Sequence, residues 1–274
     1  MTGPRRPRDA AAGDRPWPRS RSCPGIAVDL GSARVRAWIT GQDTVLDVSA
    51  ADRPGAGAGH PGRHGAVLDP AAAAAVLDRL LGHRLAGHGR PLVVLTAPAL
   101  DGVAYRAAAR GAVRVLRPRA VLTVPSARAV AMAAGADLTS PLLVADLGAR
   151  FTEVVLLADG AVVDARRAAL GTAELGGATT ARHLGEAVVT MLTAMLRQDR
   201  TSLTLDALRR GPLLAGGGAL RPEIVHHLSG RLHAPVAPVP APHTAAVRGA
   251  AGLLGSAHGH PSVSGRVRAP ARPR

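Results

Sequence analysis

The chain has almost no aromatic residues. They make up 1% of its 274 residues, whereas hydrophobic residues of all kinds make up 47%. A core with so few rings must consist of Ala, Val and Leu, so we expect closely packed helices on a Val-rich sheet. The same scarcity counts against binding of single-stranded nucleic acid, because such binding relies on aromatic side chains that stack on bases.

Cysteine and long apolar runs are also lacking. The single Cys23 excludes a disulfide within the chain and is typical of a reducing cytoplasm. No run approaches the roughly 18 apolar residues of a membrane span, and the pair Arg5-Arg6 has no apolar segment behind it that would make a secretory signal. Five prolines in residues 1–24 exclude an amphipathic helix there. We therefore expect a cytoplasmic protein without direct membrane insertion, recruited to the inner face of the membrane only through partners.

Lysine and asparagine are absent altogether, so the net charge of +15 comes from arginine alone. Residues 1–24 hold six arginines against two acids, and residues 256–274 hold four arginines and no acid. These two Pro-rich segments supply about half of the net charge, and their composition predicts disordered tails. An Arg-rich protein associated with nucleic acid therefore remains an alternative, although no recognisable reading helix supports specific binding.

Between the tails, from about residue 25 to residue 255, strands and helices alternate. Asp69 followed by Pro70 is typical of a helix start, with a capping side chain and a proline at the first helical position. Alternation of this kind predicts an α/β fold with parallel or mixed sheets. Strands are expected at 25–30, 33–39, 43–49, 92–98, 119–124, 141–146, 153–158, 161–165 and 211–215. Helices are expected from residue 70 and near 103–115, 126–135, 179–199, 222–232 and 243–254.

One unit occurs twice in this order: an apolar strand, Asp-Leu-Gly, two further strands, a glycine-rich loop and a long helix. The copies begin with GIAVDLGSARVRAWITGQ (25–42) and PLLVADLGARFTEVVLLADG (141–160). Their glycine-rich loops are residues 50–66 and 171–178. A duplicated α/β unit indicates two similar lobes that face one cleft.

The duplication sets the expected lobe boundaries. The first lobe covers residues 25–140, including the short loop 50–66, and the second covers residues 141–255. We expect the last helix, 243–254, to pack back near the first lobe.

A strand that ends in Asp-x-Gly suits a nucleotide. The carboxylate can face Mg²⁺ and its waters, glycine lets backbone N–H groups approach phosphate oxygens, and a hydroxyl adds a hydrogen bond. Either turn alone is most often an ordinary turn, and the matched pair makes the nucleotide interpretation stronger. In the first copy these residues are Asp29, Gly31 and Ser32, and in the second they are Asp146, Gly148 and Thr152.

A third element is the triple glycine between a strand and a helix at residues 216–218. It permits close approach of the backbone to a ribose or a flat ring, although it is also typical of a plain turn. The expected metal ligands are Asp29 and Asp146. The expected nucleotide-binding residues are Asp29, Gly31, Ser32, Ala33, Arg34, Asp146, Gly148, Ala149, Arg150, Thr152, Gly216, Gly217, Gly218 and Ala219.

In this order the motifs resemble those of the actin and heat-shock chaperone ATPase superfamily, and most closely its bacterial MreB branch. The family's DLGTAN stands here as DLGSAR (29–34), and its DIGGGTTEVAV as DLGARFTEVVL (146–156). Its LTGGGALL stands as LAGGGALR (214–221), and its PLTCVARGAG as APHTAAVRGAAG (241–252). The resemblance spans about residues 25–255. It implies duplicated ribonuclease-H-like lobes around a nucleotide cleft.

The sequence departs from the family at three points. Residues 50–66 and 171–178 are too short for the two small outer subdomains that the family inserts there. The family's Glu-Glu-Pro before the connecting helix is TVPSARAV here (123–130), so the carboxylate that orients the attacking water is missing. Ala149 and Arg150 replace glycines, so either the second turn binds phosphate less closely or the Arg150 guanidinium meets the phosphates directly.

The resemblance implies a cytoskeletal protein of the rod-shape-determining MreB type. Such a protein acts in cell shape and in cell-wall or spore-wall synthesis, by association with a full-length MreB-like protein and the wall-synthesis machinery. ATP with Mg²⁺ is expected to bind weakly or no longer at all, without efficient turnover. An active ATPase or small-molecule kinase of the same superfamily is the alternative. Glu153 and Asp164 are expected to be charges at a strand edge.

Overall fold

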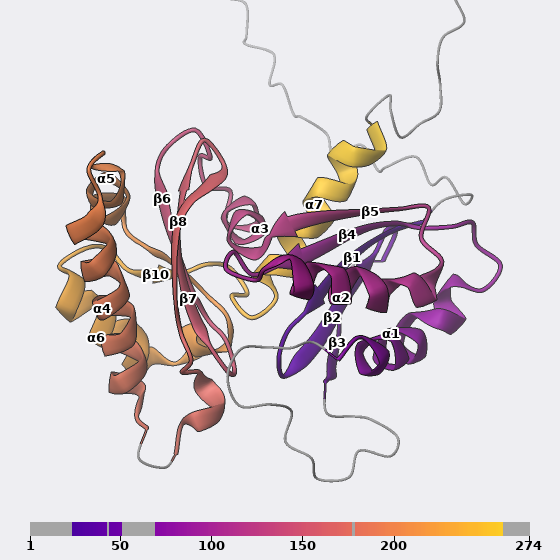
Figure 1. The fold of residues 1–274 in the computed structure, drawn as a ribbon, viewed down its shortest axis with the longest axis horizontal. Coiled ribbons are helices and arrows are strands. Elements are labelled where there is room, and N and C mark those ends of the chain that lie inside the picture. Colours follow the sequence, from indigo (N-terminus) through magenta and orange to yellow (C-terminus); the bar gives the residue numbers. More distant parts are fainter. Residues whose placement is uncertain (1–23, 43, 51–68, 177–178, 260–274) are drawn as a thin grey trace, which may run out of the picture.

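The computed structural model describes residues 24–42, 44–50, 69–176 and 179–259 (Figure 1). The tails predicted for residues 1–24 and 256–274 and the loop predicted for residues 50–66 therefore lie largely outside the described residues. What is described consists of two β-sheets with helices on their faces (Figure 1).

The first sheet has the strand order β3-β2-β1-β4-β5. β2 is antiparallel to both β1 and β3, whereas β4 and β5 continue the sheet in parallel to β1. The strands are β1 (Gly25–Leu30), β2 (Arg34–Ile39), β3 (Leu46–Ser49), β4 (Leu92–Ala97) and β5 (Ala120–Pro125).

The second sheet repeats this order strand for strand as β8-β7-β6-β9-β10. β7 is again antiparallel to both neighbours, and β9 and β10 are again parallel to β6. This repetition confirms the predicted α/β fold of duplicated ribonuclease-H-like lobes. The strands are β6 (Leu142–Leu147), β7 (Thr152–Ala158), β8 (Ala161–Ala168), β9 (Leu213–Ala215) and β10 (Ala237–Pro238).

Helices follow the third, fourth and fifth strands of each sheet. α1 begins as predicted, because the Asp69 carboxylate accepts hydrogen bonds from the backbone N–H groups of Ala71 and Ala72, each at 3.0 Å. The sequence analysis missed α5 and β10, and α7 continues past its predicted end at residue 254 into the segment assigned to the tail. The helices are α1 (Pro70–Leu85), α2 (Val103–Val113), α3 (Ser126–Ala133), α4 (Ala181–Gln198), α5 (Leu203–Arg210), α6 (Pro222–Leu232) and α7 (Ala245–Gly259).

Two helices cross between the lobes and lie between the sheets (Figure 1). α3 follows β5 of the first sheet, yet its Val130 packs in one cluster with Val144 and Val155 of the second. α7 follows β10 of the second sheet, yet its Val247 packs with Ala27 of β1. The two helices also contact each other so closely that a Cβ on Gly249 would lie 1.7 Å from the backbone oxygen of Ala129. The two crossing helices therefore join the lobes.

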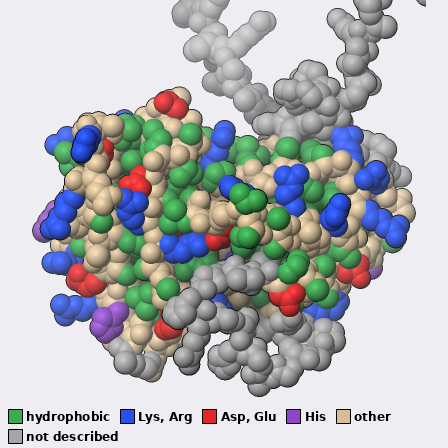
Figure 2. Space-filling model, in the orientation of Figure 1, with side chains coloured by type: hydrophobic (Ala, Val, Ile, Leu, Met, Phe, Trp, Pro, Cys, Tyr) green, Lys and Arg blue, Asp and Glu red, His purple; other side chains and the backbone are tan. Residues whose placement is uncertain are grey.

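The described residues form no separate outer subdomain. Between β8 and α4 they hold only the short helix η2 (Thr172–Glu174), and β3 is followed by residues 51–68, which lie outside the description. Of the helices that are described, none is long and apolar enough to span a bilayer. Arginine side chains are spread over both lobes on the visible face and are not confined to one (Figure 2).

Candidate functional site

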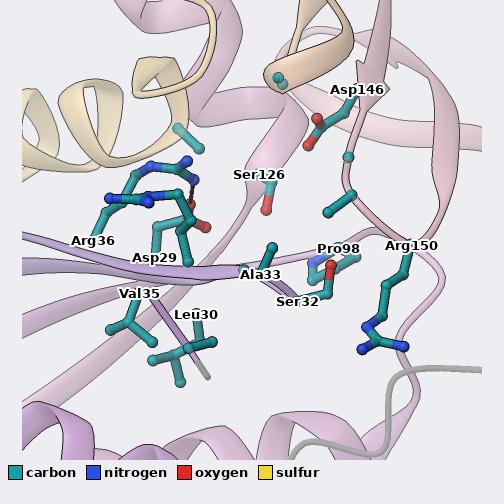
Figure 3. Close-up of a pocket in the computed structure, with 18 of the residues that line it drawn as sticks. Asp29, Leu30, Ser32, Ala33, Val35, Arg36, Pro98, Ser126, Asp146 and Arg150 are labelled. Carbon is teal, nitrogen blue, oxygen red and sulfur yellow. Dashed lines mark ion pairs between the residues drawn. The ribbon is translucent and has the colours of Figure 1, made fainter. Parts of the chain in front are cut away.

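A cavity of about 410 Å³ lies between the two sheets, at the carboxyl ends of their parallel strands. Both Asp-Leu-Gly turns line it, and Asp29 and Asp146 approach it from opposite lobes (Figure 3). Open α/β sheets bind ligands at this edge. The predicted residues that line the cavity are Asp29, Gly31, Ser32, Ala33, Arg34, Asp146, Gly148, Ala149, Arg150, Gly216 and Gly217.

Three predicted residues do not line the cavity. Thr152 is fully buried, and its hydroxyl donates a hydrogen bond of 2.9 Å to the backbone oxygen of Leu170. Gly218 and Ala219 pack beneath the site, where a Cβ on Gly218 would lie 2.6 Å from the Leu147 Cβ and Ala219 belongs to the core. For Thr152 the physical reason is strand register, which turns its hydroxyl toward Leu170 although the residue lies close to the turn along the chain.

The two turns are copies of each other in their backbone. A Cβ on Gly31 would lie 2.8 Å from the backbone oxygen of Arg34, and a Cβ on Gly148 would lie 2.8 Å from that of Phe151. In both turns the glycine therefore meets the carbonyl group three residues later. By this equivalence Ala149 occupies the place of Ser32, so the second turn presents no hydroxyl to the cavity.

The glycine segment after β9 comes up against the second turn. Gly216 has a positive φ of 80°, and a Cβ there would lie 2.4 Å from Asp146 Oδ1. Only glycine satisfies both conditions. A Cβ on the neighbouring Gly217 would meet no atom within 4 Å, so this residue borders open space.

Asp29 in the first turn has partners on both of its carboxylate oxygens. Oδ1 accepts a hydrogen bond of 2.7 Å from the Thr96 hydroxyl, and Oδ2 lies 3.5 Å from Arg36 Nη1. Arg36 also reaches Asp47, with 3.3 Å between Nε and Oδ2. Asp29, Arg36 and Asp47 stand opposite one another on β1, β2 and β3, so strand register creates this row of alternating charge. The sequence analysis missed Arg36.

Asp146 in the second turn has the opposite surroundings. Its cross-strand partner is Glu153, in the place that Arg36 holds beside Asp29. The pKa of Asp146 is raised to about 7, mainly by desolvation and then by the charges of Asp29 and Glu153, against the lowering effect of Arg36. At neutral pH this carboxyl group is therefore protonated in part of the molecules.

Glu153 is not the strand-edge charge that was predicted. It is 3% exposed, and its carboxylate accepts hydrogen bonds from the backbone N–H groups of Ala99 at 2.9 Å and Leu100 at 3.1 Å. Those two residues follow β4 of the first lobe, whereas Glu153 lies on β7 of the second. The prediction failed because β7 is covered on both faces.

Arg167 on β8 completes an inter-lobe ion cluster with Asp101 and Glu153. Its guanidinium lies 2.6 Å from Asp101 Oδ1 and 2.8 Å from Glu153 Oε1, and it stacks 4.5 Å from the centre of the Phe151 ring. Asp101 and Glu153 are both nearly inaccessible. The cluster therefore joins the second turn to the segment before α2, through charges removed from water.

The cavity also contains residues that sequence reasoning did not select. Tyr105 donates a hydrogen bond of 3.1 Å to the backbone oxygen of Leu30, and burial raises the pKa of its hydroxyl. Ser126, the first residue of α3, points toward the space between Asp29 and Asp146 (Figure 3). Tyr105 belongs to no recognisable motif, whereas Ser126 lies in the segment TVPSARAV (123–130), which drew attention only for the carboxylate that it lacks.

A magnesium ion is the metal that the resemblance implies, and the first turn does not fit it. Both oxygens of Asp29 already have partners, one of which is the fixed cation Arg36. In the part of the chain that the structure describes, no group of three His, Cys, Asp or Glu side chains could hold a metal ion. Mg²⁺ often uses only one or two carboxylates, so it does not need a larger cluster. The contact with Arg36, in contrast, occupies the carboxylate that the ion would use.

The two matching sheets, the crossing helices and the cavity between the two turns define the actin fold. Searches found no matching family model and no matching curated protein. Solved structures do match. MreB5 of Spiroplasma citri bound to AMPPNP superposes with a TM-score of 0.72 at 16% identity, over 88% of this chain and 98% of that chain.

Two further structures share the fold. The MamK double helical filament gives a TM-score of 0.64 at 13% identity, over 85% of this chain and 99% of that chain. The ethanolamine utilization protein EutJ of Carboxydothermus hydrogenoformans gives 0.59 at 15% identity, over 86% of this chain and 91% of that chain. At these identities the similarity shows the fold and nothing further.

Proposed function

We propose that this chain is an actin-like cytoskeletal protein that binds an adenine nucleotide between its lobes, residues 25–140 and 141–255. The observation that carries the proposal is the pair of backbone-equivalent turns on opposite sides of one cavity of about 410 Å³. A volume of that size is typical of small-ligand sites. MreB5 in the matching structures is bound to ADP in one and to AMPPNP in another.

The phosphates belong between the turns in this proposal. Glycines at residues 31 and 148 allow the backbone to approach phosphate oxygens, and Ser32 adds a hydroxyl on one side. The ribose and base belong beside Gly216 and Gly217, which both line the cavity and of which Gly217 borders open space. Arg150 lies on the exposed rim with its side chain directed away from Asp146, in a position from which it can meet a phosphate tail (Figure 3).

We propose slow turnover for this site. The acidic residues among the described cavity-lining residues are Asp29, Asp69 and Asp146. Asp29 is paired with Arg36, and Asp69 caps α1. At the start of α3, where the resemblance would place a water-orienting carboxylate, the cavity meets Ser126. We expect ATP hydrolysis below about 0.01 s⁻¹, at least a hundredfold slower than typical phosphoryl-transfer enzymes.

The cellular role that we propose is association with another actin-like chain in assemblies that contribute to cell shape and wall synthesis. The matching MamK structure is a double helical filament, which supports association of this fold with copies of itself or of a relative. Light scattering of the purified chain, alone and mixed with a longer actin-like protein, tests this role. Filaments that form from the mixture and not from the chain alone are the expected result.

Isothermal titration with ADP and ATP tests nucleotide binding. We expect a Kd on the order of 10 μM, about −7 kcal/mol, for the wild type. Gly217→Leu should abolish the binding heat, because its side chain enters the cavity without a clash of its Cβ. Gly230→Leu on α6 is the matched control, since a Cβ there also meets nothing within 4 Å but lies outside the cavity. Equal titrations for both variants would contradict the proposed site.

A further inference from the structure

The row Asp29–Arg36–Asp47 places a permanent cation where a nucleotide site of this kind would place a metal. Arg36 projects from β2, and its side chain is 14% exposed. Its guanidinium lies between two carboxylates, 3.5 Å from Asp29 and 3.3 Å from Asp47. Arg36 also lines the cavity, beside Asp29 (Figure 3).

We propose that Arg36 replaces a divalent cation at Asp29, so that the cavity binds its nucleotide without Mg²⁺. This inference rests on the proposed nucleotide site. It goes beyond that site by making Arg36 the residue that determines its metal requirement.

Two properties of Arg36 support the replacement. A guanidinium group stays charged at every physiological pH and presents several N–H donors in one plane, so it can serve both carboxylates at once. Strand register fixes its position, because Arg36 is the direct cross-strand partner of Asp29 and of Asp47. A metal that coordinates Asp29 would have to displace this contact inside a largely buried row of charges, and Mg²⁺ gives up its waters reluctantly.

The second turn shows what the same position looks like without a cation. Glu153 stands opposite Asp146, and its carboxylate is already committed to Arg167 and to the backbone of residues 99 and 100. Of the two turn carboxylates, Asp29 therefore faces a cation on the neighbouring strand, whereas Asp146 faces the acidic residue Glu153. One carboxylate supplies only a single protein ligand, so a metal at this cavity would depend almost entirely on the nucleotide.

The charge of the phosphates is then met by arginine and by backbone N–H groups. Arg34 and Arg150 lie in the two turns and line the cavity. Arg34 is held by Asp47, with 2.6 Å between Nε and Oδ1, and remains 46% exposed. Arg150 lies on the exposed rim. Because the chain contains no lysine, arginine is its only permanently positive side chain that can meet the charge of the phosphates.

Fluorescent ADP titrations in millimolar MgCl₂ and in excess EDTA test the inference on the full chain. For the wild type we expect Kd values within about threefold of each other. Arg36→Gln frees Asp29, so its Kd should become at least about tenfold lower with MgCl₂ than with EDTA. Arg36→Lys keeps the charge and should behave like the wild type.

Arg34→Gln is the matched control, because the Arg34 guanidinium contacts Asp47, both at its carboxylate and at its backbone oxygen. It should leave the Kd independent of MgCl₂. A wild-type Kd at least about tenfold lower in MgCl₂ would overturn the inference while leaving the proposed nucleotide site intact. Circular dichroism of each variant verifies that it is folded.

A second titration does not depend on nucleotide at all. Mn²⁺ binding to the unliganded chain, followed by electron paramagnetic resonance, should be undetectable at the site in the wild type and should appear in Arg36→Gln. Absence of nucleotide binding in either buffer would refute the proposed function, and the Mn²⁺ titration would still decide the role of Arg36. Equal Mn²⁺ binding by the wild type and Arg36→Gln would overturn that role.

Discussion

The first and second Asp-Leu-Gly turns have the same backbone and opposite electrostatics. In each, a glycine Cβ would lie 2.8 Å from the carbonyl oxygen three residues later. Yet the residue across the strand is Arg36 beside Asp29 and Glu153 beside Asp146. The duplication has therefore kept the topology, while the cross-strand position has taken on a different chemical task in each copy.

The two cross-strand residues therefore have different tasks: Arg36 neutralises a carboxylate, and Glu153 holds the two lobes together. In the first turn Arg36 balances the carboxylate that faces the cavity. In the second turn the equivalent side chain leaves Asp146 uncompensated and instead joins the inter-lobe ion cluster with Asp101 and Arg167. The second turn is thus tied mechanically to the first lobe, and burial, together with the charges of Asp29 and Glu153, raises the pKa of Asp146.

The largest effect should come from breaking the inter-lobe ion cluster. Glu153→Gln removes one of the two carboxylates that contact Arg167 and turns an amide NH₂ group toward one of the backbone N–H groups of Ala99 and Leu100, which should lower the free energy of unfolding by about 3–5 kcal/mol. Thermal and urea denaturation measure the loss. Asp164→Asn is the matched control, because Asp164 pairs with Arg166 where both are about a third exposed, and we expect at most about 1 kcal/mol. Similar losses for both variants would contradict the bracing role.

Alanine at the two turn glycines tests whether the backbones are equivalent. In Gly31→Ala and in Gly148→Ala the new Cβ would meet a backbone oxygen at 2.8 Å, so each should lower stability by about 1–3 kcal/mol. The two losses, measured by urea denaturation, should agree within about 1 kcal/mol. Gly217→Ala, whose Cβ meets nothing, should have little effect. A large loss in only one turn would show that the copies differ in their backbone.

The smallest effect on stability should come from replacing the turn carboxylates Asp146 and Asp29 by asparagine, and its sign should differ between the two. The folded-state pKa of Asp146 is raised to about 7, above its ordinary value, so the folded state binds this proton more tightly than the unfolded state. The wild type therefore loses stability as the pH rises from about 4 to about 7, and above about pH 7 the stability contributed by this proton is fully lost. Asp146→Asn removes it and should stabilise the protein at pH 8 by about 1–2 kcal/mol, allowing for screening at the cavity.

Asp29→Asn should instead destabilise the protein at pH 8, because it removes one of the two carboxylates that balance Arg36. Urea denaturation of both variants at pH 4 and at pH 8 measures the effects. The stabilisation by Asp146→Asn should disappear at the lower pH. Destabilisation by both substitutions at pH 8 would contradict the electrostatic difference between the turns.

The sequence was sufficient for the repeated order of strands and helices. Apolar runs mark nearly all strands, and Asp69-Pro70 marks the start of α1. It was not sufficient for α5, which is short and polar, or for β10, whose two residues lie in a Pro-rich stretch. Such elements form because they pack on the second sheet, and local propensity does not reveal that contact.

The site was predictable where glycine and aspartate define a turn, and not where strand register decides. The turns and the triple glycine carry local signals, whereas Arg36 and Glu153 acquire their roles only from the strand opposite. Arg167 meets Asp101 from a position 66 residues away, so no local pattern could indicate the pair. Thr152 shows the reverse case, because its closeness to the turn suggested a ligand, whereas its side chain is buried and bonds the backbone oxygen of Leu170.

A crystal structure of the full chain grown with ADP in the presence of EDTA tests the central claim most directly. The account predicts a diphosphate between Gly31 and Gly148, with the ribose against Gly216 and the Arg36–Asp29 contact intact. ADP bound elsewhere, or held by one turn with the other facing away from it, would contradict the account.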